Sequence, residues 1–263
     1  MTQTDKMLSR KEGQVGYMTF NNPERRNAVS LEMWEAAAAI LDDFVQDDNI
    51  RVVVLAGAGG KAFVSGADIS KFESERSSEE AVARYNAAVE RANTTIYTFP
   101  KPTIAMIQGY CIGGGLGLAG CCDLRIASED SRFAVPAAKL GLGYGYPGIK
   151  RLADVVGPAF AKEIFYTARQ FDAAEAVAMG LVNRVLPVAE LETYVKGYAG
   201  AIGENAPLTI AAVKFIANEV VKDDSKRDPA RCAAMVKRCF DSQDYIEGRR
   251  AFMEKRKPVF TGM

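Results

Sequence analysis

Histidine is absent from the 263-residue chain. Without imidazole, Ser-His-Asp and Cys-His nucleophile mechanisms are excluded, and so is any metal site built on histidine ligands. A proton-transfer step therefore has to use a carboxylate, lysine, tyrosine, cysteine or water. We expect no metal site.

An excess of charge is also missing, because 33 lysine and arginine residues balance 33 aspartate and glutamate residues. Binding to nucleic acids or anionic membranes usually depends on a positively charged surface. The chain also lacks an apolar run of about 18 residues, the length that suggests a membrane-spanning helix. We expect neither nucleic acid nor a membrane as a partner.

Cysteine is scarce, with five residues at positions 111, 121, 122, 232 and 239. Their number is odd, and no pair has the C-x-x-C spacing of redox and metal motifs. No signal peptide is recognisable, so these residues are predicted to be reduced and mostly buried thiols of a cytoplasmic protein. The apolar surroundings of Cys121 and Cys122 favour a packing role over a reactive one.

Apolar patterning predicts a mixed α/β protein, and the hydrophobic content of 48% is that of a globular chain. The predicted strands cover residues 14–21, 51–56, 103–110, 123–128, 133–135 and 182–186. From residue 158 onward the pattern becomes mainly helical. We predict one core domain over residues 1–190 and a helical C-terminal subdomain over residues 191–263.

Two capping boxes mark predicted helix starts. Ser77 with Glu80 opens one helix, and Asp172 with Glu175 opens another. Gly180 follows the second helix and is placed to end it, since glycine readily adopts the left-handed conformation there.

The most unusual stretch is CIGGGLGLAGCCD at residues 111–123. It follows a predicted strand and opens a helix, which places backbone N–H groups at the positive end of a helix dipole. A tight turn alone needs only one or two glycines. The letters G-x-G-x-x-G also occur in dinucleotide sites, but those require an acidic residue about 20 positions on, and residues 134–144 contain none.

A phosphate-binding P-loop is excluded, because no Gly-Lys-Ser/Thr follows the glycines. The interpretation that we favour is an oxyanion hole, in which backbone N–H groups stabilise a developing enolate or thioester oxyanion. A second strand-to-helix passage, KAFVSGADISKF at residues 61–72, is placed to supply another donor.

With these two motifs the chain resembles the crotonase superfamily, also called the enoyl-CoA hydratase/isomerase family. The resemblance covers nearly the whole chain. It implies the α/β crotonase fold with a spiral of repeated β-β-α turns, a homotrimer or homohexamer, and an acyl-CoA substrate without a separate cofactor. Five blocks carry it in order: NNPERRNAVS (21–30), KAFVSGADI (61–69), KPTIAMIQGYCIGGGLGLAGCCDLRIA (101–127), FDAAEAVAMGLVNRVLP (171–187) and EGRRAFMEKRKPVF (247–260).

The resemblance also implies where the thioester binds. In the family, the backbone N–H groups of the residues matching Ala67 and Gly114 hold the thioester oxygen. The turn around Ala67 lies where the adenine end of CoA docks. The residues of this turn that we expect to bind CoA are Ser65, Gly66, Asp68 and Ile69.

Further CoA contacts are expected from both ends of the chain. Phe252 and Lys255 match positions on the family's C-terminal helix that reach CoA, often across a subunit boundary. Arg25 and Arg26 are candidates for the CoA phosphates, because guanidinium groups bind phosphate well. Exposed arginines in a loop are also commonplace, so both interpretations stay open for this pair.

The chain departs from the family where acids are expected. Hydratases of the family use two glutamates, and the matching positions hold Gly117 and Ala137. The position that supplies an acid in isomerases and a nucleophilic aspartate in dehalogenases holds Gly145. We therefore do not expect hydration by the two-glutamate mechanism.

Tyr144 resembles the active-site tyrosine of the family's methylmalonyl-CoA decarboxylases, although those enzymes can carry histidine at the position of Ala67. Decarboxylation needs no general base, and a pocket without carboxylates does not repel a substrate carboxylate. Tyr144 is thus a third catalytic candidate, with a structural role in its glycine-rich loop as the alternative. Tyr146 and Lys139 are weaker candidates.

The sequence therefore predicts an acyl-CoA enzyme that stabilises a thioester enolate, with decarboxylation favoured. The alternatives are a hydratase or isomerase with a non-standard acid-base residue, and a catalytically inactive CoA-binding subunit.

Overall fold

The computed structural model describes residues 4–71 and 77–263, and it contains two sheets that share the same core. The six-stranded sheet has the order β1-β2-β3-β5-β7-β10, and the four-stranded sheet has the order β4-β6-β8-β9. The larger sheet consists of β1 (Met7–Glu12), β2 (Val15–Phe20), β3 (Val52–Gly57), β5 (Thr103–Ile107), β7 (Leu124–Ser128) and β10 (Arg184–Leu186). The smaller sheet consists of β4 (Ala62–Val64), β6 (Tyr110–Ile112), β8 (Arg132–Ala134) and β9 (Phe171–Asp172).

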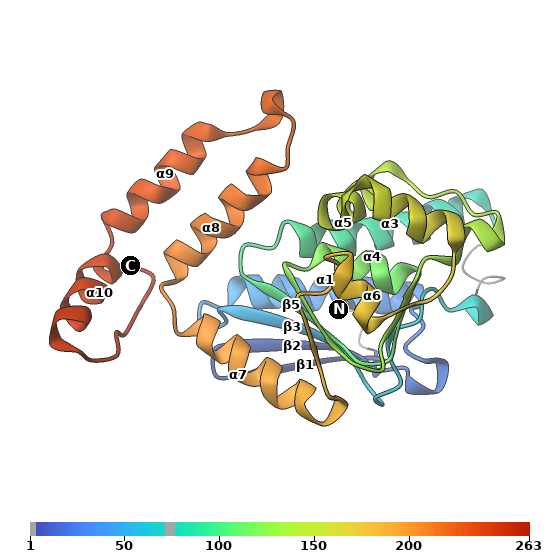
Figure 1. The fold of residues 1–263 in the computed structure, drawn as a ribbon, viewed down its shortest axis with the longest axis horizontal. Coiled ribbons are helices and arrows are strands. Elements are labelled where there is room, and N and C mark those ends of the chain that lie inside the picture. Colours follow the sequence, from blue (N-terminus) through green and yellow to red (C-terminus); the bar gives the residue numbers. More distant parts are fainter. Residues whose placement is uncertain (1–3, 72–76) are drawn as a thin grey trace.

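Helices connect and cover these strands (Figure 1). They are α1 (Leu31–Gln46), α3 (Glu79–Tyr97), α4 (Gly114–Cys121), α5 (Tyr146–Thr167), α6 (Ala173–Ala178), α7 (Leu191–Gly203), α8 (Pro207–Val220), α9 (Pro229–Phe240) and α10 (Gln243–Glu254). Among them, no helix in the described part of the chain is both long and apolar enough to cross a membrane.

A three-part unit repeats along the core. In each unit, one strand enters the larger sheet, a short strand enters the smaller sheet, and a helix follows. The units are β3-β4-α3, β5-β6-α4 and β7-β8-α5. This arrangement confirms the predicted α/β crotonase fold.

The apolar pattern of β3 explains its central place. Its sequence VVVLAG is buried almost throughout. β2 and β5 pair with it in parallel on both edges, and packed side chains cover both of its faces. Val53 and Leu55 belong to the core under α1, α3, α4 and α5. Val52 and Val54 face the other side, where α7 covers the sheet. A strand buried on both faces requires such a continuous apolar run.

The predicted strands and caps are largely confirmed, with two corrections. The strand predicted at residues 103–110 is two strands, β5 and β6, because Gly109 turns the chain with a φ of 68° into the second sheet. The capping box predicted at Ser77 is wrong, since Ser78 is the N-cap and accepts from the Ala81 N–H. The box formed by Asp172 and Glu175 is present as predicted.

The last three helices form an arm that projects from the core (Figure 1). The Lys214 ammonium on α8 donates to Asp123 and to the Lys101 carbonyl at 2.8 and 2.9 Å. The Arg51 guanidinium donates to carbonyls of the C-terminal tail and of α7, at Phe260 and Gly203. These contacts attach the arm, residues 207–263, to the sheet. The predicted boundary between residues 190 and 191 stays a prediction.

Two glycines of α4 should respond in opposite ways to replacement by alanine. A Cβ atom on Gly115 would lie 2.1 Å from the Val64 carbonyl oxygen, whereas one on Gly120 would meet no atom within 4 Å. We expect Gly115→Ala to lower the free energy of unfolding by about 3 kcal/mol. Gly120→Ala should leave it unchanged or raise it by up to about 1 kcal/mol, because alanine favours the helix. Urea denaturation of both variants measures the difference, and equal stabilities would contradict the close approach.

Candidate active site

The two strand-to-helix turns predicted from the sequence lie against each other. β4 pairs in parallel with β6, so the chain leaves both strands at the same edge of the smaller sheet. Gly115 packs directly on the Val64 carbonyl, with no space for a side chain. A Cβ atom on Gly114 would lie 4.0 Å from the Gly66 Cα atom. The glycines thus bring the turn after β4 into contact with the start of α4.

Gly113 shapes the entry into α4. Its φ of 57° and ψ of −116° are strained for residues with a side chain. Its N–H donates to the Ala134 carbonyl, and its own carbonyl accepts the first helical bond from Gly117. The Gly114 N–H precedes the first helical bond and has no hydrogen-bond partner in the described part of the chain. It lies at the positive end of the helix, where an oxyanion is stabilised.

Ala67 presents a second N–H group. It forms a parallel bridge with Val29, in which Val29 donates to the Gly66 carbonyl and accepts from the Asp68 N–H at 2.9 and 3.0 Å. Because the flanking residues make both bonds, the N–H of Ala67 points away from Val29. No residue within 4–71 or 77–263 accepts from it.

A buried hydrogen-bond chain holds this turn in place. The Val29 carbonyl also accepts from the Tyr85 hydroxyl on α3 at 3.3 Å. That hydroxyl in turn accepts from the indole N–H of Trp34 on α1 at 3.2 Å. Trp34 is only 1% exposed, so two core helices fix the backbone that carries Ala67.

The predicted CoA-binding residues of the two N-terminal loops are brought together. Ser65 donates through its N–H to the Arg26 carbonyl and through its hydroxyl to the Arg25 carbonyl, at 3.2 and 3.3 Å. The Arg26 guanidinium lies 4.9 Å over the Tyr110 ring. Both arginines are exposed, and neither pairs with an acid among the described residues. The loop therefore carries two positive charges beside the turn.

Asp68 has a local structural role. Its side chain is buried and accepts from the N–H and the hydroxyl of Ser70 at 3.1 and 2.6 Å. This contact starts the short 3-10 helix η2 (Ile69–Lys71), in which Ile69 is the first residue. Direct contacts of Asp68 and Ile69 with a ligand stay predictions.

Tyr144 fills the space beside α4 where a side chain at position 117 would stand. A Cβ atom on Gly117 would lie 3.2 Å from the Tyr144 hydroxyl, and one on Gly148 would lie 2.7 Å from its ring. The ring also packs edge-on against Phe165, with centroids 4.9 Å apart. A larger side chain at position 117 would therefore require the Tyr144 ring to shift from its observed position.

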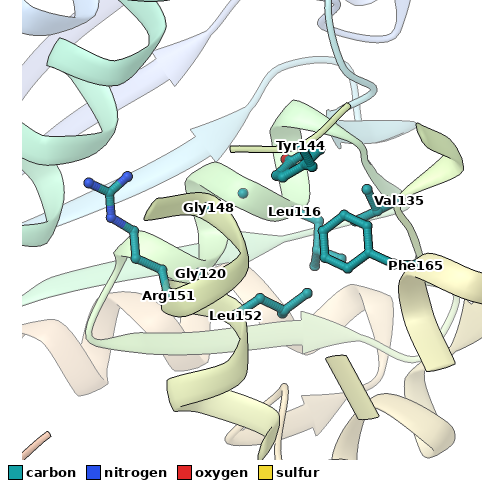
Figure 2. A pocket seen from close by; sticks show the side chains of 9 residues that line it. Leu116, Gly120, Val135, Tyr144, Gly148, Arg151, Leu152 and Phe165 are labelled. Carbon is teal, nitrogen blue, oxygen red and sulfur yellow. The ribbon is translucent and has the colours of Figure 1, made fainter. Parts of the chain in front are cut away.

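The hydroxyl of Tyr144 borders a small cavity without a carboxylate. Figure 2 shows Leu116, Val135, Leu152 and Phe165 grouped around it, whereas the Arg151 guanidinium points away. That guanidinium donates to Glu90 and Thr94 on α3 instead. The full lining consists of Leu116, Gly117, Gly120, Val135, Tyr144, Gly148, Arg151, Leu152 and Phe165.

The Tyr144 hydroxyl is a neutral donor. Burial raises the pKa of Tyr144, and the neighbouring Cys121 raises it further. The hydroxyl has no hydrogen-bond partner among the residues that the structure describes. A protonated and unpaired hydroxyl beside a cavity is suited to donating a hydrogen bond or a proton.

The other candidates lie elsewhere. Ala137 is buried in the 3-10 helix η3 (Pro136–Leu140), and Gly145 is the exposed N-cap of α5. Lys139 and Tyr146 are exposed and do not line the cavity. Phe252 and Lys255 lie at the end of α10 in the arm, apart from the core (Figure 1), so one chain alone does not bring them to Ser65.

Sequence reasoning missed Phe165 and Leu152, which complete the cavity from α5. Phe165 lies in the second half of a helix whose first half begins beside Tyr144. The break in this helix at Gly157 brings the rings of Tyr144 and Phe165 together. The hydrophobic pattern of the sequence around Phe165 does not indicate this contact.

Fold and site together define a crotonase-type protein, in which two glycine-bearing turns present backbone N–H groups at one edge of a β-β-α spiral. The sequence profile of the enoyl-CoA hydratase/isomerase family matches residues 10–263. The chain belongs to this family.

Individual relatives match nearly the full length of the chain. A crotonyl-CoA hydratase of Syntrophomonas wolfei is 36% identical, with 97% of this chain and 98% of the relative covered. A short-chain-enoyl-CoA hydratase of Clostridium acetobutylicum is 32% identical, with 97% of each covered. The crystal structure of an enoyl-CoA hydratase/carnithine racemase from Magnetospirillum magneticum superposes with a TM-score of 0.94 at 38% identity, covering 99% of this chain and 97% of that one.

The buried cysteines beside the site should resist alkylation. Burial raises the pKa of Cys121 to about 12 and also raises the pKa values of Cys111 and Cys122. At pH 8 a thiol with such a pKa is ionised in about one molecule in ten thousand, and the thiolate is the reactive form. We expect iodoacetamide to spare these three residues in the native protein and to label them in urea, as read by mass spectrometry. Native labelling of Cys121 at the rate of the half-buried Cys232 would contradict this.

Proposed function

We propose that the protein acts on an acyl-CoA thioester and stabilises its enolate through the N–H groups of Ala67 and Gly114. Both groups are unpaired in the described part of the chain, and they belong to two turns in backbone contact. Such preorganised donors are worth most where negative charge develops on oxygen. Family membership supports the thioester, because relatives bear the names of enoyl-CoA hydratases.

The favoured reaction is decarboxylation of a malonyl-type thioester. The bond between the α-carbon and the substrate carboxylate breaks, carbon dioxide leaves, and the electron pair passes into the thioester as an enolate. The α-carbon then takes a proton from the Tyr144 hydroxyl, which solvent reprotonates. The observation that carries this proposal is the cavity beside Gly117, which Tyr144 borders and which no carboxylate lines.

Hydration or isomerisation by a non-standard acid-base residue is the second candidate. Its support is the names of the relatives, a crotonyl-CoA hydratase and a short-chain-enoyl-CoA hydratase. Hydration needs a base for water and an acid for the α-carbon, and Gly117 and Ala137 provide neither. A catalytically inactive CoA-binding subunit is the third candidate.

For CoA itself we propose binding along the loop and turn described above, by Arg25, Arg26, Ser65, Gly66, Asp68 and Ile69. We further propose that Phe252 and Lys255 close the CoA site of a neighbouring subunit in a homotrimer or homohexamer. Phe252 and Met253 are 82% and 80% exposed on α10. They border a largely apolar groove of about 870 Å³ between the helices of the arm. Exposed apolar surface of this extent is typical of interfaces.

A substrate panel tests the reaction. Purified protein is incubated with malonyl-, methylmalonyl- and crotonyl-CoA, and the products are read by mass spectrometry. We expect loss of carbon dioxide from a malonyl-type thioester and poor or no hydration of crotonyl-CoA. Hydration with a kcat near the typical enzyme value of about 10 s⁻¹ would overturn the proposal. Binding of CoA without any product would favour the inactive subunit.

The pH profile and a variant of Tyr144 distinguish a proton-donating role of this residue from a purely structural one. Because its pKa is raised, the hydroxyl keeps its proton at neutral pH and loses it only above the ordinary value of about 10. We expect kcat/KM to be level from about pH 6 up to the ordinary tyrosine pKa of about 10 and to fall only above it. Tyr144→Phe should lower kcat by about a hundredfold with KM nearly unchanged. An unaltered kcat in this variant would assign Tyr144 a structural role only.

The oligomer prediction has its own measurement. Light scattering at micromolar concentration should give a trimer or hexamer of the 28.5 kDa chain. Phe252→Asp places a charge on the exposed apolar surface of the arm and should shift the mass toward the monomer. A monomeric wild type would contradict the shared CoA site.

A further inference from the structure

Trp34 is the only tryptophan of the chain, and it lies beside the start of α4. A Cβ atom on Gly114 would lie 3.9 Å from the Cζ2 atom of the indole and 4.0 Å from the Gly66 Cα atom. The indole, the first residue of α4 and the turn after β4 therefore surround the same point. Trp34 reaches this point from α1, in the core of the molecule.

Hydrogen bonds link the same edge of the indole to the second turn. The indole N–H donates to the Tyr85 hydroxyl, and that hydroxyl donates to the Val29 carbonyl, at 3.2 and 3.3 Å. The N–H and the Cζ2 atom lie on one edge of a rigid ring. One side chain thus connects Gly114 with the backbone segment that bridges Ala67.

Val29 controls the direction of the Ala67 N–H. This N–H belongs to the same peptide plane as the Gly66 carbonyl, which accepts from the Val29 N–H at 2.9 Å. Because the peptide bond is planar and trans, the N–H points away from that carbonyl. A fixed position of Val29 therefore fixes the direction in which Ala67 presents its N–H.

The polar groups of this chain exceed what packing requires. The Val29 carbonyl already accepts from the Asp68 N–H at 3.0 Å, so it would be paired without Tyr85. Phenylalanine at positions 34 and 85 would also fill the core without burying a polar group. Trp34 and Tyr85 are only 1% and 3% exposed, and buried polar groups cost free energy unless they are paired. We read the second hydrogen bond on the carbonyl as a restraint on its direction.

We propose that Trp34 and Tyr85 are positioning residues that set the separation and direction of the two oxyanion donors. This inference rests on the proposed function, because it assumes that the thioester oxygen accepts from Ala67 and Gly114. The edge of the indole supports the Gly114 end, and the Tyr85 hydroxyl supports the Ala67 end through Val29. Neither side chain touches the substrate in this arrangement.

Infrared spectroscopy of a bound, unreactive thioester tests the positioning without turnover. The probe is acetyl-CoA, measured with and without carbon-13 at the thioester carbonyl, so that the difference spectrum shows only this C=O stretch. Acetyl-CoA has no carboxylate to lose and no double bond to hydrate. For the wild type we expect the stretch to move to lower frequency than in buffer, because two fixed donors polarise the carbonyl more strongly than water does.

Tyr85→Phe removes one hydroxyl and keeps the ring. We expect it to reduce the frequency shift by about half, since one of the two donors loses its support, and to leave the Kd for acetyl-CoA nearly unchanged. Trp34→Phe removes the indole edge beside Gly114 as well as the N–H, so it should reduce the shift further. With a thioester that the wild type converts, kcat should fall about tenfold in Tyr85→Phe with KM nearly unchanged.

Tyr97→Phe is the matched control. It makes the same change on the same helix, α3, where the Tyr97 ring lies 5.4 Å from the Arg151 guanidinium. We expect the frequency shift and the Kd of this variant to equal those of the wild type. The emission of Trp34 checks that Tyr85→Phe and Tyr97→Phe are folded, because the indole is buried in the native protein and exposed in urea.

The outcomes separate this inference from the proposed function. Failure of the wild type to bind acetyl-CoA, or a bound C=O stretch equal to that in buffer, would overturn the proposed function and this inference together. A folded Tyr85→Phe with the full wild-type shift, or an equal loss of shift in Tyr97→Phe, would overturn the positioning role alone. A reduced shift in Tyr85→Phe with the full shift in Tyr97→Phe supports the proposal.

Discussion

The backbone contact between Gly115 and the Val64 carbonyl is the constraint on which the rest of the site depends. A side chain at position 115 would force β4 and α4 apart, since its Cβ atom would lie 2.1 Å from that oxygen. With glycine there, the turn carrying Ala67 meets the first residue of α4. Two backbone N–H groups from distant parts of the sequence then reach the same edge of the smaller sheet.

The surrounding core makes this geometry rigid. Trp34 on α1 and Tyr85 on α3 reach the Val29 carbonyl through two hydrogen bonds, and Val29 bridges the turn at Ala67. A buried polar chain of this kind holds its members in one arrangement, because leaving any of them unpaired is costly. Donors fixed before substrate binds need no reorganisation during the reaction.

Tyr144 determines the shape and polarity of the cavity beside α4. Its ring uses the space left by two glycines, Gly117 and Gly148, and Phe165 packs against it from behind. The result is an apolar, carboxylate-free cavity with one neutral hydroxyl. A side chain at position 117 and this ring compete for the same volume, so glycine at 117 and tyrosine at 144 depend on each other.

The sequence by itself determined the α/β class, most strands, the two glycine turns and the missing acids, because hydrophobic periodicity and glycine placement are local properties. It did not reveal that residues 103–110 divide between two sheets. In the sequence these residues form one mainly apolar run, and the turn at Gly109 leaves no separate signal in it. Only the tertiary structure decided that Tyr144 covers Gly117 and that Phe165 closes the cavity. These contacts depend on the break in α5 at Gly157 and on the packing of α5 against α4, and long-range packing of this kind leaves no periodic signal in the chain.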